Sequence, residues 1–303
     1  MKRHFLIVAA LLAAVPAWAT VTVFATVPEW GALAQEIGGD KVSVFTATTG
    51  LQDPHRIQAK PSLISRARNA DLLVATGAEL ELGWLPLVQR ESGNPRIQSG
   101  QAGYFEATQF VALLEKPARL DRAEGDVHAA GNPHIQTDPR NFLKVGAALA
   151  QRLAQLDAAN AAVYAANEKR FHERLQAAIA RWEKAAAPLR GAPILVQHKA
   201  FPYLENWLGL REMGSLEAKP GMEPSSAQLT EILARQQAQP ARMVLRPAYQ
   251  YDAPSRWLAE RTKINRVTVP FTIGGTPEAK DIFSLFDATV QRLLDGMQGR
   301  DMP

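Results

Sequence analysis

Short runs of β-branched and aliphatic residues alternate with helical stretches over residues 20–75. The strand-like runs cover residues 20–27, 42–45 and 71–75, and the helical stretches cover 30–37 and 61–67. Short apolar runs bounded by turn-forming residues are typical of buried strands, and their alternation with helices is typical of α/β proteins. The pattern predicts an α/β lobe with a mostly parallel sheet flanked by helices.

The last third of the chain repeats this pattern. Strand-like runs cover residues 193–196, 242–245 and 266–269, and an amphipathic helical stretch covers 281–297. Ser225 and Gln228 have the spacing of a capping box, which marks the start of a helix. A second α/β lobe of the same design is therefore predicted.

A segment rich in Ala, Leu, Gln, Glu, Lys and Arg joins the two predicted lobes. Pro139 suits a first helical turn, and no Gly or Pro lies between positions 147 and 187. A continuous helix over 138–187 would be on the order of 60 Å long, at ~1.5 Å per residue. A helix–turn–helix broken near residues 156–160 is the alternative.

The N-terminus predicts a secreted protein. Lys2 and Arg3 precede an apolar run over residues 5–15, and small residues follow at Ala17 and Ala19. This pattern predicts a signal peptide over 1–19, cleaved after Ala19, and a location in the periplasm, with a membrane anchor as the alternative. Because the chain contains no cysteine, a lipid anchor on a mature N-terminal Cys is excluded.

We therefore predict three parts after the signal peptide. They are an N-terminal α/β lobe over 20–137, a long connecting helix over 138–187 and a C-terminal α/β lobe over 188–303, with no transmembrane segment. Removal of Lys2 and Arg3 with the signal peptide lowers the formal charge from +4 to +2. This charge is too small to indicate a nucleic acid or a polybasic membrane contact.

Three histidines lie at the ends of predicted elements. His55 is in a strand-to-helix loop, His134 lies just before the connecting helix, and His198 follows the run 193–196 at an equivalent place in the second lobe. A lone histidine of this kind is usually a surface or hydrogen-bonded structural residue. Three of them at the ligand-binding ends of α/β elements predict one metal site between the lobes, because neutral imidazole suits Zn, Ni, Cu or Fe.

Two other histidines receive different interpretations. His172 lies within a helical stretch beside Arg170, Glu173 and Arg174, which indicates a solvated helix face. His128 is close to His134 in the sequence and is an accessory ligand candidate, with a plain loop residue as the alternative.

The segments around the three histidines carry a family resemblance. They are Asp53-Pro54-His55 with Lys60-Pro61-Ser62, Asn132-Pro133-His134 with Asp138-Pro139-Arg140-Asn141, His198-Lys199-Ala200-Phe201 with Tyr203 and Gly209-Leu210, and Glu223-Pro224-Ser225. In this order they resemble the zinc/manganese-binding receptors of bacterial ABC importers, the cluster A-I solute-binding proteins. The resemblance implies two α/β lobes joined by one long helix, with a metal bound in the interlobe cleft and delivered to a membrane permease.

The chain also departs from that family. Manganese receptors commonly have a carboxylate ligand in the stretch that matches residues 268–275, which contains no acid here. Lys199 replaces a common acid after the third histidine, and Gln136 replaces an aromatic residue. The His/Asp-rich loop of many zinc receptors is absent or reduced to Asp126 and His128.

These departures favour zinc as the metal. Mn²⁺ prefers sites rich in oxygen ligands, whereas tetrahedral Zn²⁺ accepts three nitrogens and a fourth ligand. Mn²⁺ or another divalent transition metal stays an alternative. The fourth ligand is water, Glu29, Asp53, His128 or Asp252, of which Glu29 is the preferred acid because it follows the first strand. The ordinary interpretations of the three acids are a helix-start acid for Glu29, a turn residue for Asp53 and a surface charge in a loop for Asp252.

A zinc-dependent hydrolase with an open three-histidine site is the alternative from another class. The chain contains no His-Glu-x-x-His or Gly-x-Ser-x-Gly motif, so we predict a binding protein and not an enzyme. A metal-binding adhesin or metallochaperone of the same fold is a third option. The expected partners are a divalent metal ion and an ABC permease with its ATPase, and the expected state is a monomer.

Overall fold

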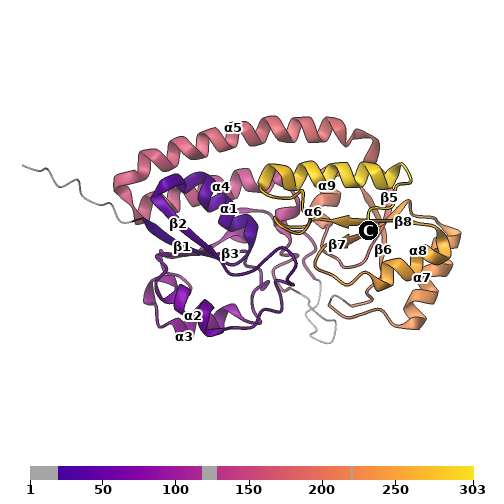
Figure 1. Ribbon diagram of the computed structural model, residues 1–303, viewed down its shortest axis with the longest axis horizontal. Coiled ribbons are helices and arrows are strands. Elements are labelled where there is room, and N and C mark those ends of the chain that lie inside the picture. The colour runs from indigo at the N-terminus through magenta and orange to yellow at the C-terminus, as the bar shows by residue number, and fades with distance from the viewer. Residues whose placement is uncertain (1–19, 118–127, 220) are drawn as a thin grey trace, which may run out of the picture.

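The computed structural model describes residues 20–117, 128–219 and 221–303. The predicted signal peptide and Asp126 lie outside the described residues. Figure 1 shows two lobes side by side, with one long helix running along both of them.

The first lobe is built on a parallel sheet of β1 (Val21–Ala25), β2 (Val42–Thr46), β3 (Leu72–Ala75) and β4 (Tyr104–Glu106), in the order β2-β1-β3-β4. Its helices are α1 (Pro28–Gly38), α2 (Pro61–Arg68) and α3 (Leu85–Ser92). Alternate residues of β1 point to opposite faces, so Val23 packs with Leu33 of α1 while Phe24 packs with Leu63 of α2. The sheet is therefore covered on both faces, as parallel sheets usually are.

The second lobe has the same arrangement. Its parallel sheet contains β5 (Pro193–Val196), β6 (Arg211–Ser215), β7 (Met243–Pro247) and β8 (Asn265–Val269), in the order β6-β5-β7-β8. Its helices are α6 (Pro202–Leu208), α7 (Ser226–Ala238), α8 (Ala253–Thr262) and α9 (Ile282–Met297). The predicted capping box is present, because the Ser225 side chain accepts from the Gln228 backbone and the Gln228 side chain accepts from Ser225. The predicted two-lobed α/β fold is confirmed.

The continuous helix predicted over 138–187 is wrong, and the alternative is observed. α4 (Pro139–Leu156) ends before Asp157, and α5 (Ala161–Ala185) begins four residues later. Asp157 leaves the helical conformation (φ −139°, ψ 74°), and its carboxylate accepts hydrogen bonds from Asn160 and from the Tyr164 hydroxyl. These bonds stabilise the turn, so α4 folds back against α5 and α5 alone is the long helix.

Short 3₁₀ turns complete the described secondary structure. They are Gly39–Lys41, Pro95–Ile97, Ala107–Phe110, Ile135–Thr137, Ala158–Asn160 and Ala187–Leu189.

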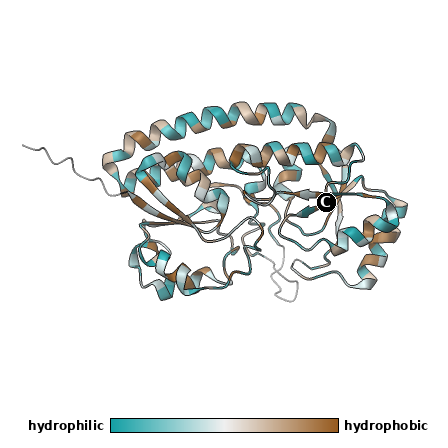
Figure 2. Ribbon diagram, viewed as in Figure 1, coloured by the Kyte–Doolittle hydropathy of each residue, from teal (hydrophilic) through white to brown (hydrophobic). Residues whose placement is uncertain are grey.

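A continuous apolar core joins the lobes. Trp30 of α1 packs against Phe142 of α4, with ring centroids 5.3 Å apart, and Phe142 meets Phe286 of α9 at 5.8 Å. Phe286 in turn contacts Trp182 of α5 at 5.2 Å. In Figure 2 the hydrophobic positions of these helices face the inside of the molecule. The lobes are thus held together by aromatic packing that does not depend on the cleft.

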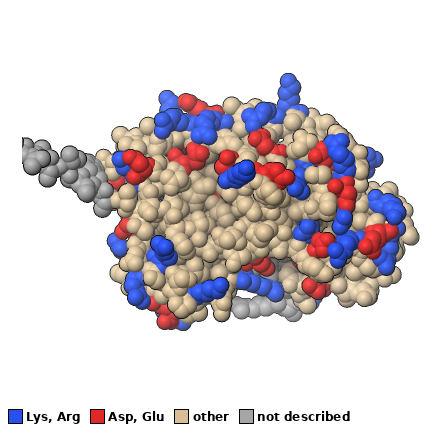
Figure 3. Space-filling view, viewed as in Figure 1, with Lys and Arg blue, Asp and Glu red and all other residues tan. Residues whose placement is uncertain are grey.

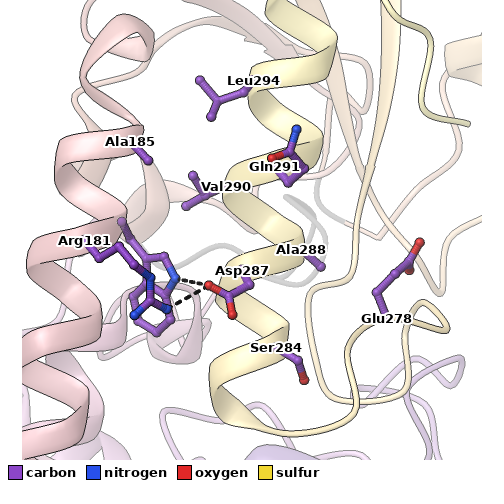
Figure 4. A pocket seen from close by; sticks show the side chains of 10 residues that line it. Arg181, Ala185, Glu278, Ser284, Asp287, Ala288, Val290, Gln291 and Leu294 are labelled. Carbon is purple, nitrogen blue, oxygen red and sulfur yellow. Dashed lines mark hydrogen bonds and ion pairs between the residues drawn. The ribbon is translucent and has the colours of Figure 1, made fainter.

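Polar contacts add to this packing between α5 and α9. In an open groove between these helices, Asp287 accepts hydrogen bonds from Arg181 Nη2 (3.0 Å) and Trp182 Nε1 (2.6 Å) (Figure 4). None of the histidines that the structure describes lines this groove.

Charged side chains of both signs are interspersed over the face shown in Figure 3, without a basic stripe. Among the described residues, no helix combines the length and the apolar character needed to cross a membrane.

Candidate metal site

His55 lies in the loop between β2 and α2. Asp53 Oδ1 accepts hydrogen bonds from the His55 backbone N–H (3.0 Å) and from its Nδ1 (2.8 Å), an Asx turn that orients the ring. Trp84 Nε1 donates to the carbonyl of Pro54 (2.9 Å) and anchors the same loop. With the proton on Nδ1, the His55 Nε2 keeps its lone pair; this atom is buried and has no hydrogen-bond partner among the described residues.

His134 is buried at the start of the turn Ile135–Thr137 that leads to α4. Its backbone N–H donates to Asn132 Oδ1 (3.0 Å), and its carbonyl accepts from the Thr137 hydroxyl (2.9 Å). The ring packs edge-on against Phe271, with centroids 5.2 Å apart. Its Nδ1 is buried and lacks a hydrogen-bond partner in the described part of the chain.

His198 follows β5 in the second lobe. Its Nδ1 donates to Glu217 Oε2 at 2.7 Å, and both side chains are buried. This bond places the proton on Nδ1 and leaves the Nε2 lone pair for a metal. Because β5 corresponds in strand order to β1, the place of His198 is not equivalent to that of His55, which follows β2.

The structure brings the three predicted ligands together. One ring nitrogen from each of His55, His134 and His198 lies within 4.8 Å of the others. The ring centroids are 5.3 Å apart for His55 and His134, 6.0 Å for His55 and His198, and 5.8 Å for His134 and His198. Three nitrogens bound to one zinc at ~2.0–2.1 Å in tetrahedral geometry lie about 3.3 Å apart. Each pair of nitrogens, at most 4.8 Å apart in the structure, would therefore have to approach by no more than about 1.5 Å to bind one zinc.

Electrostatics keep His134 neutral. Burial, together with the neighbouring histidines, lowers the pKa of His134 well below its usual value. A neutral imidazole is the form that binds a metal. Burial opposes ionisation of Asp53, but its hydrogen bonds and electrostatic interaction with His55 outweigh burial and lower the pKa of Asp53. The site thus combines a neutral imidazole with an outer carboxylate.

The other predicted ligand candidates lie outside the three-histidine group. His128 is beside His55, with ring centroids 5.4 Å apart. Glu29 is buried and accepts a hydrogen bond from the Thr272 hydroxyl of the second lobe, and burial raises its pKa to about 7. Asp252 pairs with Arg256 (3.3 Å).

Asp53 contacts the group through His55 and not through a shared metal position. The predicted solvated face at His172 is consistent with its position on α5, where its partly exposed ring lies 3.4 Å from Glu168. Glu217 was missed by sequence reasoning. An acid at the end of a strand would have been the signal, but β6 has no apolar pattern that identifies it as a strand.

A family model described as "ZnuA: Zinc-uptake complex component A periplasmic" matches residues 23–296. The chain belongs to this family. Membership in the ZnuA family confirms the resemblance to metal receptors of ABC importers that the motifs indicated.

One curated ZnuA-family relative is the "High-affinity zinc uptake system protein ZnuA" of Paracoccus denitrificans, which is 28% identical over 77% of this chain and 78% of its own length. A solved structure described as "Crystal structure of ZnuA" has a TM-score of 0.76 and 21% identity, covering 91% of this chain and 99% of that chain. A mutant structure of the laminin-binding adhesin (Lmb) from Streptococcus agalactiae has a TM-score of 0.73 and 20% identity, with the same coverage. The structural matches show a shared fold.

Proposed function

We propose that this protein captures a divalent transition metal, zinc above all, in the interlobe cleft through His55, His134 and His198. The convergence of three ring nitrogens within 4.8 Å, from segments 79 and 64 residues apart in the sequence, carries the proposal. Two of these rings bury a nitrogen without a hydrogen-bond partner among the described residues, which is costly unless another ligand occupies it. A metal ion bound at these rings would supply such a ligand.

Zinc is favoured by the donor set. The group contains three nitrogens and, within the described residues, no carboxylate. In the second lobe, Thr272 lies in the stretch where manganese receptors supply an acid, and its hydroxyl is bonded to Glu29. Three imidazoles with a water or His128 in the fourth position suit tetrahedral Zn²⁺ better than Mn²⁺.

The metal is cargo in this proposal. The protein, cleaved after Ala19 and monomeric in the periplasm, would deliver the ion to an ABC permease and its ATPase. The family description as a zinc-uptake component and the name of the Paracoccus denitrificans relative support this role.

Metal analysis tests the proposal. Protein purified without added metal is analysed for bound elements and then titrated with Zn²⁺, Mn²⁺ and Ni²⁺ in competition with a chelator of known affinity. We expect one Zn²⁺ per chain and tighter binding of Zn²⁺ than of Mn²⁺ or Ni²⁺. The His172→Ala variant is the control, because its ring lies on α5 beside Glu168. A wild-type protein that binds no divalent metal would contradict the proposal.

A zinc-dependent hydrolase remains the alternative from another class. A hydrolytic zinc site needs a carboxylate base near the metal-bound water. The acids that contact the described site residues, Asp53 and Glu217, are bonded to the Nδ1 atoms of His55 and His198. We expect zinc-loaded protein to leave peptide, ester and phosphoester substrates intact over hours, and steady turnover abolished by His134→Ala would favour the hydrolase.

A further inference from the structure

Glu217 is the centre of a hydrogen-bond network behind His198. Its Oε2 accepts from His198 Nδ1 (2.7 Å) and from the backbone N–H of Gly221 (2.9 Å), and its Oε1 accepts from Gln250 Nε2 (3.0 Å). The side chain is only 8% exposed. Three donors thus hold this carboxylate in place. Gly221 lies in the loop after β6, Gln250 in the loop after β7, and His198 in the loop after β5.

The carboxylate of Glu217 can compensate the charge of a bound divalent ion. Three neutral imidazoles leave both positive charges of a divalent ion uncompensated, and an isolated charge is costly to bury. Among the described residues, two carboxylates contact the ligand rings, Asp53 on His55 and Glu217 on His198. Together they balance the ion without entering its coordination sphere. Asp53 is 37% exposed, so water screens its charge far more than that of Glu217.

We propose that Glu217 is a positioning residue for metal capture: it holds His198 with Nε2 toward the cleft and supplies the buried negative charge that retains a divalent cation on an all-nitrogen ligand set. This inference rests on the proposed function. Carboxylates that accept from the outer nitrogen of a metal-binding histidine raise its basicity and fix its tautomer. Glu217 therefore strengthens binding of nitrogen-preferring Zn²⁺ without offering the oxygen ligand that Mn²⁺ prefers.

The hydrogen-bond partners of Glu217 allow the effect of its charge to be tested separately from the effect of its hydrogen bonds. In Glu217→Gln, the amide oxygen can accept from His198 and Gly221, while the amide nitrogen faces Gln250. Gln250 Oε1 is buried without a hydrogen-bond partner among the described residues, so rotation of the Gln250 amide would turn an acceptor toward the new donor. This variant removes the charge and keeps the hydrogen bonds. Glu217→Ala removes both.

The experiment measures Zn²⁺ affinity by chelator competition for the full mature chain. We expect a loss of about 100-fold for Glu217→Ala and about 10-fold for Glu217→Gln, within the range known for outer partners of metal ligands. Asp53→Asn should lose only about 3-fold, because water screens the charge of the partly exposed Asp53. The matched control is Glu168→Gln, which alters a histidine–carboxylate pair on α5, far from the cleft, and should bind zinc as the wild type does.

A spectroscopic readout distinguishes positioning from other roles. Co²⁺ replaces Zn²⁺, and the visible spectrum of the Glu217→Gln complex should keep the band pattern and intensity of the wild-type complex, because the coordinating atoms are unchanged. Loss of a ligand field band, or a change in coordination number, would make Glu217 a direct ligand and overturn the proposal. Thermal unfolding of the metal-free variants is recorded beside these spectra; a drop in stability for Glu217→Gln that accounts for the weaker binding would also overturn it.

The two proposals fail separately. If His198→Ala abolishes zinc binding while both Glu217 variants bind as the wild type does, the positioning role is wrong and the three-histidine site stands. If neither His198→Ala nor the Glu217 variants change binding, the proposed metal site itself is wrong.

Discussion

The two lobes have the same strand order, but histidine and glutamate occupy opposite positions in their corresponding loops. β1 and β2 of the first lobe correspond to β5 and β6 of the second. Glu29 follows β1 and His55 follows β2, whereas His198 follows β5 and Glu217 follows β6. In these corresponding loops, each lobe therefore has one histidine and one glutamate, in opposite order. A fold supplies equivalent loop positions, and the sequence decides which of them carries the ligand.

The two glutamates also differ in their surroundings. Glu217 contacts His198 and backbone and amide donors, whereas Glu29 contacts the Thr272 hydroxyl and lies near the carboxylate of Glu81. Burial raises the pKa of Glu29 to about 7. The same residue type thus serves as a charge partner for a ligand in one lobe and as a buried acid at the lobe interface in the other.

Metal removal has the largest expected effect. A ligand that binds only the folded state stabilises it by RT ln(1 + [L]/Kd), so zinc at ~1,000 times Kd should add roughly 4 kcal/mol. The metal-free protein should stay folded, because the aromatic packing from Trp30 to Trp182 joins the lobes independently of the histidines. Calorimetry and circular dichroism with zinc and with chelator measure both. Loss of helical signal in chelator would indicate a structural metal.

Replacement of His55 or His198 tests whether both histidines are needed for metal binding. His55→Ala and His198→Ala should each weaken Zn²⁺ binding by more than the ~100-fold at the upper end for outer partners, because each removes a coordinating nitrogen. The two losses should be similar, since each variant removes one of the three coordinating nitrogens and leaves the other two in place. Chelator competition measures them. Wild-type affinity in either variant would show that the replaced histidine does not bind the metal.

Glu29→Gln sharpens the contrast between the glutamates. The folded-state pKa of about 7 lies above the reference value of 4.5, so the wild-type protein loses stability as pH rises from about 4.5 to 7. The amide mimics the protonated form, and the variant should gain roughly 3 kcal/mol over the wild type at pH 8 and nothing at pH 4. Urea unfolding at both pH values measures this. Zinc affinity should change less than twofold; a loss as large as that of Glu217→Gln would erase the distinction between the lobes.

The smallest effect concerns His134 in the metal-free protein. Its folded-state pKa is lowered, so the unfolded chain binds an additional proton below about pH 6.5 and stability falls as pH falls through that value. The slope from this group is at most about 1.4 kcal/mol per pH unit. Urea unfolding between pH 7.5 and 5.5 should show a shallower slope for His134→Gln than for the wild type and for His172→Ala. Equal slopes in all three proteins would show that His134 is not kept neutral by burial.

Several elements could be predicted because their signals are local. The central strands of both sheets are short apolar runs, and the start of α7 carries its capping box in the sequence. β4 and β6 could not be predicted. Tyr104–Glu106 has only three residues, and Arg211–Ser215 is largely polar and partly exposed. These segments are strands because they pair with β3 and β5, and no local sequence pattern marks them.

By itself the sequence determined the two α/β lobes, the helical connection and the three histidines, because apolar periodicity, capping and motif spacing act over a few residues. Tertiary structure decided the rest. The sequence left the break near 156–160 as an alternative, and the roles of Glu29 and Glu217 depend on Thr272 and His198, which folding brings near. Burial and hydrogen bonding between distant segments set the charge and orientation of a side chain, and no local pattern contains that information.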